Sequence, residues 1–410
     1  MSERYFHKTL SNGMVILAER MPGVQSAAMT LLVPAGVERE PEGSLGVCAV
    51  LADLVLRGAG SRDSRQLTEH LDYLGLRRSS SPAVYYTGYS AVGVAPRVIE
   101  ALTTYADIVR RAHLPADGFA AARDLVLQEL AGIDDEPRQK LLIKAREIHF
   151  PRPLGRNTLG RREDLQRMTL ETCREHYAAH YQAHGAVISV AGNIDFAQVA
   201  DLIEAHFGDW QGRPQPPLEL RPPATRRHHE YHKSEQTHIA VACPSIRETH
   251  PDYYAMRLAV EALGGGMSGR LFTEVREKRA LAYAVSAGYA SLKEVAGIYV
   301  YAGTTSERAQ ATLDTLLDEL DRLSRGIAAD ELERARVGLK AAVIMQGESS
   351  SARSAAMAYD WIFHGRIRTL EEIARSLDAV TLEQVNSFLK RYPLVDPTIV
   401  TLGPAELRTP

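Results

Sequence analysis

The feature of this sequence that most constrains its fold is an internal repeat about half the chain in length. The segment LPADGFAAARDLVLQEL (114–130) shares its pattern with GIAADELERARVGLKAA (326–342). Arg123 corresponds to Arg336, at an offset of 336 − 123 = 213 residues. Self-similarity at one fixed offset is the signature of duplicated structural units. We therefore expect two homologous halves.

A second pair of segments extends the repeat towards the end of each half. Residues 163–181 parallel residues 375–393, and each segment precedes a short β-branched run, AVISVAG (186–192) or PTIVTLG (397–403). A helical pattern followed by a β-branched run predicts a helix and then a buried strand. Each half should therefore end in the same way.

A proline-rich segment separates the two halves. WQGRPQPPLELRPPATRRHH (210–229) holds five prolines, which cannot continue a helix or a central strand. We predict an N-terminal domain at 1–212, a linker at 213–229 and a C-terminal domain at 230–410.

The order of predicted elements is parallel in the two halves. In the first half, Asn12-Gly13 between two alternating runs predicts a hairpin with a type I′ turn, and LGVCAVLADLVLRGAG (45–60) predicts a buried helix. In the second half, a strand at THIAVACPS (237–245) precedes a glycine-ended helix and another helix at SGRLFTEVREKRA (268–280). The pattern predicts an α+β fold, with helices covering one face of a mainly antiparallel sheet in each domain.

Composition excludes several classes of function. The 410 residues carry a formal net charge of −3, and no basic blocks offer a surface for nucleic acid or anionic membrane. Three widely spaced cysteines argue against a disulfide framework or a thiolate metal site. With neither a signal peptide nor an apolar run that could span a membrane, we expect a soluble, cytoplasmic protein.

The segment LGGGMSGRLFTEVREKRALAYAVSA (263–287) carries a family resemblance. It closely resembles the second-half signature of the pitrilysin or insulinase family of zinc metallopeptidases, in which a glycine turn precedes S-x-L-F-x-x-x-R-E-x-x-x-L-A-Y. The duplicated halves, the linker and the opening Asn-Gly hairpin also look like the short members of this family. The resemblance covers nearly the whole chain.

The resemblance implies a zinc site that this chain has lost. Family members take zinc from H-x-x-E-H on the helix after the third strand, with a later Glu as third protein ligand. Matching the family's helix end to residues 57–59 puts Ala49, Ala52 and Asp53 where His, Glu and His should stand. The expected third ligand remains as Glu129, at a separation of 129 − 53 = 76 residues.

The motif has not moved elsewhere, because no H-x-x-E-H occurs anywhere in the chain. Two carboxylates offer too few donors to hold zinc against water, so we expect no metal and no other cofactor in this chain. Without a family context, an apolar helix with one Asp is a core helix. The row His176, His180 and His184 could line a metal face, although a solvated or partly packed helix side is the better interpretation.

Arg276 and Tyr283 are intact where the family carries an Arg and a Tyr that reach towards the zinc site and hydrogen-bond the substrate. The alternative is purely structural, with Arg276 paired to Glu274 or Glu277 and Tyr283 packed at a strand start. The chain has thus lost the family's zinc-binding residues but has kept the Arg and the Tyr of the second half.

This asymmetry suggests a non-catalytic subunit of a heterodimeric zinc metalloendopeptidase, inactive alone. A homologous partner would supply H-x-x-E-H and its zinc, while this chain would supply Arg276, Tyr283 and half of a chamber for unfolded or short peptides. The alternatives are a structural subunit like the respiratory core proteins, with no role in proteolysis, and an autonomous enzyme using another site. The missing motif argues against the last.

Overall fold

The computed structural model describes residues 4–409 and divides the chain into two compact units. The first unit comprises the residues up to Gly132, Arg156–Glu219 and Gln346–Ile367. The second unit comprises Ile133–Gly155, Leu220–Met345 and the residues from Arg368 onward. The change of unit at 219/220 falls inside the predicted linker. The predicted domains at 1–212 and 230–410 divide the sequence, whereas each compact unit also includes one segment from the other half.

The first unit is built on a six-stranded sheet with the strand order β1-β2-β8-β3-β7-β6. Its strands are β1 (Tyr5–Thr9), β2 (Val15–Arg20), β3 (Ser26–Val33), β6 (Arg77–Pro82), β7 (Thr87–Val94) and β8 (Val187–Gly192), and a small separate ladder pairs β4 (Gly58–Ala59) with β5 (Arg62–Asp63). Its helices are η1 (Val37–Arg39), α1 (Val47–Leu54), α2 (Ser64–Tyr73), α3 (Ala95–Arg110), α4 (Ala116–Gly132), α6 (Arg162–Arg167), α7 (Leu170–His180), α8 (Phe196–Phe207) and α12 (Ser350–His364).

The second unit is built on a five-stranded sheet with the strand order β11-β12-β10-β13-β9. Its strands are β9 (Arg227–Tyr231), β10 (Gln236–Ser245), β11 (Ala282–Ser291), β12 (Ala296–Thr305) and β13 (Thr398–Gly403). Its helices are η2 (Ile133–Asp135), α5 (Pro137–His149), α9 (Tyr253–Gly264), η3 (Phe272–Lys278), η4 (Ser306–Arg308), α10 (Ala309–Ser324), α11 (Ala329–Gly347), α13 (Leu370–Ala379) and α14 (Leu382–Arg391).

The two sheets share one topology, which confirms the predicted α+β fold with a duplicated arrangement. Read as β2-β8-β3-β7-β6 and β9-β13-β10-β12-β11, the orders correspond strand for strand. In each sheet a single pair is parallel, β2 with β8 and β13 with β9, and the other pairs are antiparallel.

The predicted β1–β2 hairpin is present, but its turn is not type I′. A type I′ turn needs a positive φ at both central residues. Here only Gly13 has one, at +84°. Asn12 instead uses its side-chain amide to donate to the carbonyl oxygens of Phe207 (2.7 Å) and Trp210 (3.1 Å). A tertiary contact therefore sets this turn.

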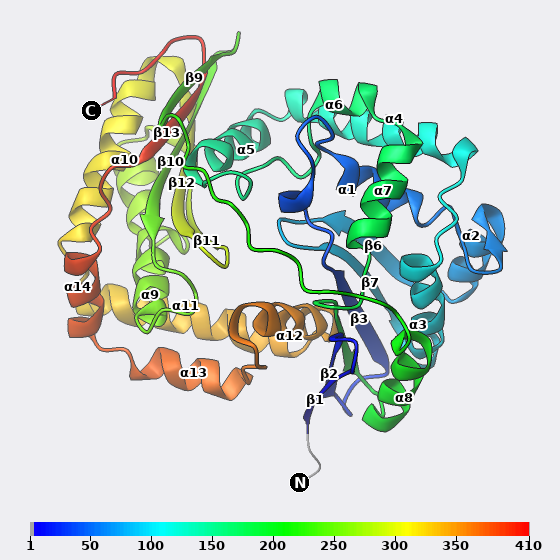
Figure 1. The fold of residues 1–410 in the computed structure, drawn as a ribbon. Helices are drawn as coiled ribbons and strands as arrows, with labels where there is room; N and C mark the ends of the chain where they lie inside the picture. Colours follow the sequence, from blue (N-terminus) through cyan, green and yellow to red (C-terminus); the bar gives the residue numbers. More distant parts are fainter. Residues whose placement is uncertain (1–3, 410) are drawn as a thin grey trace. The chain divides into compact units, whose positions relative to one another are not determined.

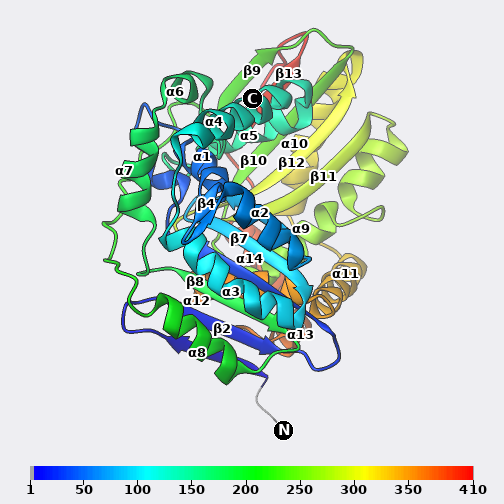
Figure 2. The same ribbon diagram turned by 90° about the vertical axis from the view of Figure 1, so that its right-hand side faces the viewer.

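The central strands of the first sheet are apolar on both faces. Because side chains alternate along a strand, Ile16 and Ala18 of β2 join the core under α3 and α8, whereas Val15 and Leu17 point to the opposite face. Figure 2 shows α3 and α8 lying across one face of this sheet. The other face needs a cover of its own.

That cover is α12, which comes from the other half of the sequence. Its Met357 and Ala358 pack on Val15, Leu17 and neighbouring apolar residues, and α12 lies along β3 and β8 (Figure 1). In the second unit α5 packs on β10 and β13 in the same way, through Leu141, Ala145 and Ile148. The two helices begin 350 − 137 = 213 residues apart, which equals the offset of the sequence repeat. They are therefore equivalent helices, and each packs in the unit formed mainly by the other half of the sequence.

Polar contacts fix α12 on its sheet. Arg353, 2% exposed, donates from Nε to Glu19 Oε2 at 2.7 Å, and Glu19 on β2 is fully buried. The Thr30 and Ser354 hydroxyls bond at 2.6 Å. A buried charge pair with fixed geometry selects one register for the helix. Across residues 4–409, no helix combines the length and the apolar character needed to cross a membrane.

We predict that Glu19→Ala destabilises the first unit by about 3–5 kcal/mol, because Arg353 is left as an unpaired buried charge. Both tryptophans, Trp210 and Trp361, lie in the first unit, so urea unfolding followed by tryptophan fluorescence reports on this unit. As a control, Glu204→Ala removes the exposed pair with Lys8 and should cost at most about 1 kcal/mol. Equal losses in the two variants would contradict the buried-charge argument.

Candidate functional site

The helix α1, where the family's metal motif would lie, is held at its start by a buried acid. Gly46 precedes α1 with φ +103°, and the Glu40 carboxylate accepts from the backbone N–H of Gly46 (3.1 Å) and of Cys48 (2.9 Å). Burial raises the pKa of Glu40 to about 7, although the two amides lower it. The fold of this segment thus survives without a metal.

The positions of the lost motif are filled or already engaged. Ala49 and Ala52 are buried and present only methyl groups. Asp53 is partly exposed and accepts from Arg57 Nε at 2.5 Å. Glu129 lies on α4, which packs against α1, and its side chain is exposed with no hydrogen bond or ion pair to any described residue. The structure therefore keeps the two helices together but does not join their two carboxylates.

These residues do not fit zinc. A catalytic zinc needs three protein ligands, and this helix pair offers two carboxylates, one of which is already paired with a guanidinium. Ala52 also leaves no side chain to act as a general base. The donor set thus supports no hydrolytic chemistry at α1.

The histidine row predicted on residues 176–184 is not a metal face. The helix α7 ends at His180, so His184 lies outside it. His176 is buried with its Nε2 3.3 Å from Cys48 Sγ, and its ring lies against that of His180. Burial lowers the pKa of His176 to about 3 and raises the pKa of the Cys48 thiol, so both groups are neutral. The pair is inert packing beneath α1.

Arg276 lies on a π-helical turn, η3, where the sequence predicted an ordinary helix. Leu271 and Val275 bury the inner side of this turn, and the guanidinium of Arg276 lies 4.9 Å from the centre of the Phe272 ring. Glu274 pairs with Lys278 at 2.7 Å. Arg276 is therefore exposed and has no hydrogen bond or ion pair within residues 4–409. π-Helical turns are rare and frequently occur at functional sites.

Tyr283 lies on the edge strand β11, 51% exposed, and its hydroxyl donates to Gln236 Oε1 at 2.9 Å. The buried Tyr301 hydroxyl hydrogen-bonds both the Tyr283 side chain and His238 Nδ1, the latter at 2.8 Å. A Cβ on Gly303 would lie 2.7 Å from the Tyr283 hydroxyl and 2.9 Å from that of Tyr301. Glycine at this position lets the two phenols meet. The hydrogen bonds with Gln236 and Tyr301 therefore fix the orientation of the Tyr283 side chain.

A strained turn separates the two retained residues. Ala280 joins η3 to β11 with φ +49°, a left-handed conformation that is uncommon outside glycine. Arg276 and Tyr283 thus sit on successive elements and both reach solvent. No hydrogen bond links the two side chains in the described part of the chain.

Sequence reasoning missed the residues that support these groups. Tyr301 and Arg270 act through contacts between segments about 60 residues apart, and Glu40 accepts from amides six and eight residues further along through a loop that has no regular periodicity. The sequence does predict that Gln236 and His238 lie on the same face of the sheet, because they are two residues apart in one strand.

Comparisons with known proteins identify the family of the chain. A family model described as insulinase (peptidase family M16) matches residues 15–161, and one described as the peptidase M16 inactive domain matches residues 167–339. An uncharacterized zinc protease of Bacillus subtilis is 27% identical over 99% of both chains. One from Mycobacterium tuberculosis is 28% identical over 92% of this chain and 88% of that protein.

Solved structures share the fold. A peptidase M16 inactive domain from Pseudomonas fluorescens matches with a TM-score of 0.90 and 21% identity over the whole of both chains. A protease from Helicobacter pylori matches with a TM-score of 0.89 and 20% identity, over 98% of this chain and 99% of that one. A chain of Complex III2 from Candida albicans matches with a TM-score of 0.83 and 21% identity, over 98% and 96%.

We predict that the purified chain holds no stoichiometric zinc and cleaves no peptide alone, because two ligands and the base are absent from α1. Metal analysis after dialysis against a zinc buffer, together with a peptide turnover assay, checks this. Glu129→Ala is the matched control and should bind as little zinc as the wild type. One tightly held zinc that this change releases would contradict the prediction.

We also predict that buried His176 makes the fold sensitive to acid. Its imidazole stays neutral in the folded state, while the unfolded chain takes up a proton below pH 6.5, so the free energy of unfolding falls as pH drops from 6.5 towards 3. The loss from this group should reach about 2 kcal/mol at pH 5.

His176→Gln should therefore lose less stability than the wild type between pH 7.5 and pH 5, in urea midpoints measured at each pH. The raised pKa of Glu40 acts in the opposite direction in every variant, so the comparison isolates His176. His113→Gln changes an exposed histidine and should behave as the wild type does. A parallel pH dependence in all three proteins would rule out this role.

Proposed function

Because the chain belongs to the insulinase family of peptidases, peptidase family M16, we propose that it is the non-catalytic subunit of a heterodimeric zinc metalloendopeptidase. A homologous partner with H-x-x-E-H would hold the zinc. This chain would contribute Arg276, Tyr283 and half of the chamber that encloses an unfolded or short peptide.

The observation that carries the proposal is the state of Arg276. An exposed guanidinium without an ion pair adds little to folding stability, and of the two acids expected as structural partners, Glu274 is paired with Lys278 and Glu277 forms no ion pair with Arg276. Apart from its contact with the Phe272 ring, this guanidinium has no partner among residues 4–409, whereas a peptide carbonyl would use its N–H donors. Tyr283, held in place through Gln236 and Tyr301, would supply a second donor.

The chemistry assigned to this chain is charge stabilisation. As water attacks a peptide carbonyl held at the partner's metal, negative charge grows on the carbonyl oxygen. Preorganised donors aimed at that oxygen bind it more tightly in the transition state than in the ground state. The guanidinium of Arg276 and the phenol of Tyr283 would serve as these donors, while proton transfer and water activation would belong to the partner.

A structural role is the second candidate, because the fold also matches a chain of Complex III2 with a TM-score of 0.83. In that case the chain would resemble a core protein and serve assembly alone. The vacated α1 agrees with both candidates. The unpaired Arg276 favours the first.

In the complex that co-purifies from the native host, Arg276→Ala or Tyr283→Phe should lower kcat by roughly 100- to 1000-fold, since loss of one such donor costs about 2.7–4 kcal/mol. Assembly should persist, because Arg276 is exposed and the Tyr change removes only a hydroxyl. Peptide cleavage and size-exclusion chromatography check both points.

Matched controls lie in the same unit. Lys390→Ala changes another exposed cation, on α14, without releasing an acid near Arg276, and Tyr231→Phe changes an exposed tyrosine on the opposite edge strand, β9. Both should cleave at the wild-type rate. If the Arg276 and Tyr283 variants assemble and cleave normally, the structural role replaces the catalytic one.

A further inference from the structure

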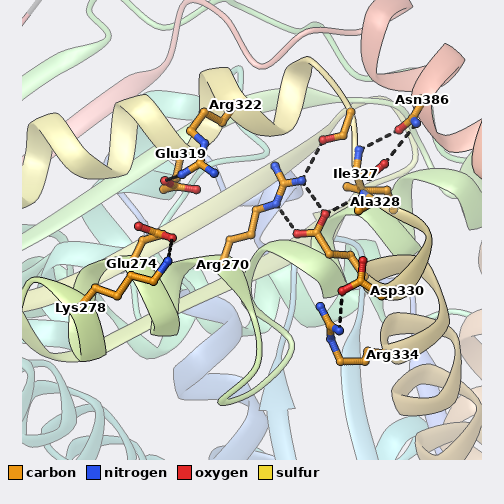
Figure 3. A network of polar contacts seen from close by, with 12 residues as sticks. Arg270, Glu274, Lys278, Glu319, Arg322, Ile327, Ala328, Asp330, Arg334 and Asn386 are labelled. Carbon is orange, nitrogen blue, oxygen red and sulfur yellow. Dashed lines mark hydrogen bonds and ion pairs between the residues drawn. The ribbon is translucent and has the colours of Figure 1, made fainter.

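The π-helical turn that carries Arg276 is tied to the second unit by one ion pair at its start. Arg270 Nε donates to Glu331 Oε1 at 2.5 Å, and Arg270 Nη2 donates to Glu331 Oε2 at 2.7 Å (Figure 3). Nη2 also donates to the carbonyl of Gly326 at 2.9 Å. The two side chains are only 15% and 17% exposed. This bidentate, largely buried geometry is among the strongest that an ion pair adopts.

Glu331, the acid of this pair, lies in a turn that further hydrogen bonds fix. Glu331 Oε2 also accepts from the backbone N–H of Ala328 at 2.7 Å, which fixes the start of α11. Asn386 on α14 accepts from the N–H of Ile327 (2.8 Å) and donates to its carbonyl (3.2 Å). Figure 3 shows these contacts meeting at the turn before α11. Arg270 is thus bonded to a turn that residues of α11 and α14 hold in place.

Arg270 follows a glycine-rich segment of the backbone. Between α9 and Arg270 lie Gly265, Gly266 and Gly269, and Gly266 has φ +144° with nothing near its Cβ position. Glycine gives a backbone freedom that only external contacts remove. Leu271 and Val275 anchor η3 inward through apolar packing, which is non-directional. Arg270 supplies a directional contact at the start of η3, and hydrogen bonds from Arg279 to Thr315 and from Arg308 to the Ala280 carbonyl supply others after its end.

We propose that Arg270 and Glu331 are positioning residues, which hold the π-helical turn in the register that presents Arg276. This inference rests on the proposed function, in which Arg276 must be correctly placed to bind the peptide carbonyl. Neither residue touches the peptide. Both act through the backbone of 270–276.

The first test uses the isolated chain and needs no partner. Glu331→Gln keeps the shape but removes the charge, and it should speed amide hydrogen exchange in 270–283 by about 10-fold, the equivalent of one charge-assisted hydrogen bond. Exchange in α10 should not change. Arg270→Lys keeps the charge without the fork and should give a smaller effect on the same segment. No change in 270–283, or an equal increase throughout the second unit, would overturn the proposal.

The second test uses the assembled complex. Glu331→Gln should lower kcat on the order of 10- to 100-fold with little change in KM, the cost of a misplaced group. The same change in an Arg276→Ala background should lower kcat no further, because its effect passes through Arg276. Asp330→Asn is the control, since it breaks the exposed Asp330–Arg334 pair one residue away and should have no effect.

The outcomes separate this proposal from the proposed function. If Arg276→Ala lowers kcat and Glu331→Gln lowers it further by an independent factor, the positioning role fails and the proposed function stands. If Arg276→Ala has no effect in an assembled complex, the proposed function fails and the positioning role falls with it.

Discussion

The structure depends on one constraint, which is that the central strands of each sheet are apolar on both faces. In the first sheet β3 and β8 are buried along nearly their whole length, so helices on one side alone would leave a large apolar face in water. Each compact unit meets this need by taking α5 or α12 from the other half of the sequence. Neither half of the chain therefore contains all of its own core.

The exchange explains why charge is buried so deeply in the first unit. A helix that arrives from far along the chain needs more than apolar contact to select its position, because apolar packing tolerates sliding. The pair between Arg353 and Glu19, with the Thr30–Ser354 hydrogen bond, supplies that selection. In the second unit His149 at the end of α5 bonds Thr398 of β13 at 3.0 Å and does the same with neutral groups.

The two halves have diverged in what they expose. In the first half, α1 presents methyl groups at Ala49 and Ala52, and its one acid is paired with Arg57, so the fold is complete and the chemistry is gone. In the second half, several polar contacts serve two exposed groups. Gln236, Tyr301 and His238 support Tyr283, and Arg270 with Glu331 supports the turn of Arg276. This difference is the physical reason for the proposal that the second half carries the groups that act on a peptide.

The sequence alone determined what is local or repetitive. It showed the duplication, the α+β class, the loss of the metal motif at 49–53 and the retention of Arg276 and Tyr283, since these are read from spacing and residue type. Only the tertiary structure decided the exchange of α5 and α12, the capping of α1 by Glu40 and the π-helical form of η3. It also decided which partners hold Tyr283 and Arg270. Most of these features depend on contacts between segments far apart in the sequence, 334 residues in the case of Glu19 and Arg353, and no local pattern encodes such a distance. The Glu40 cap spans only six to eight residues, but it requires the path of an irregular loop that residue types alone do not specify.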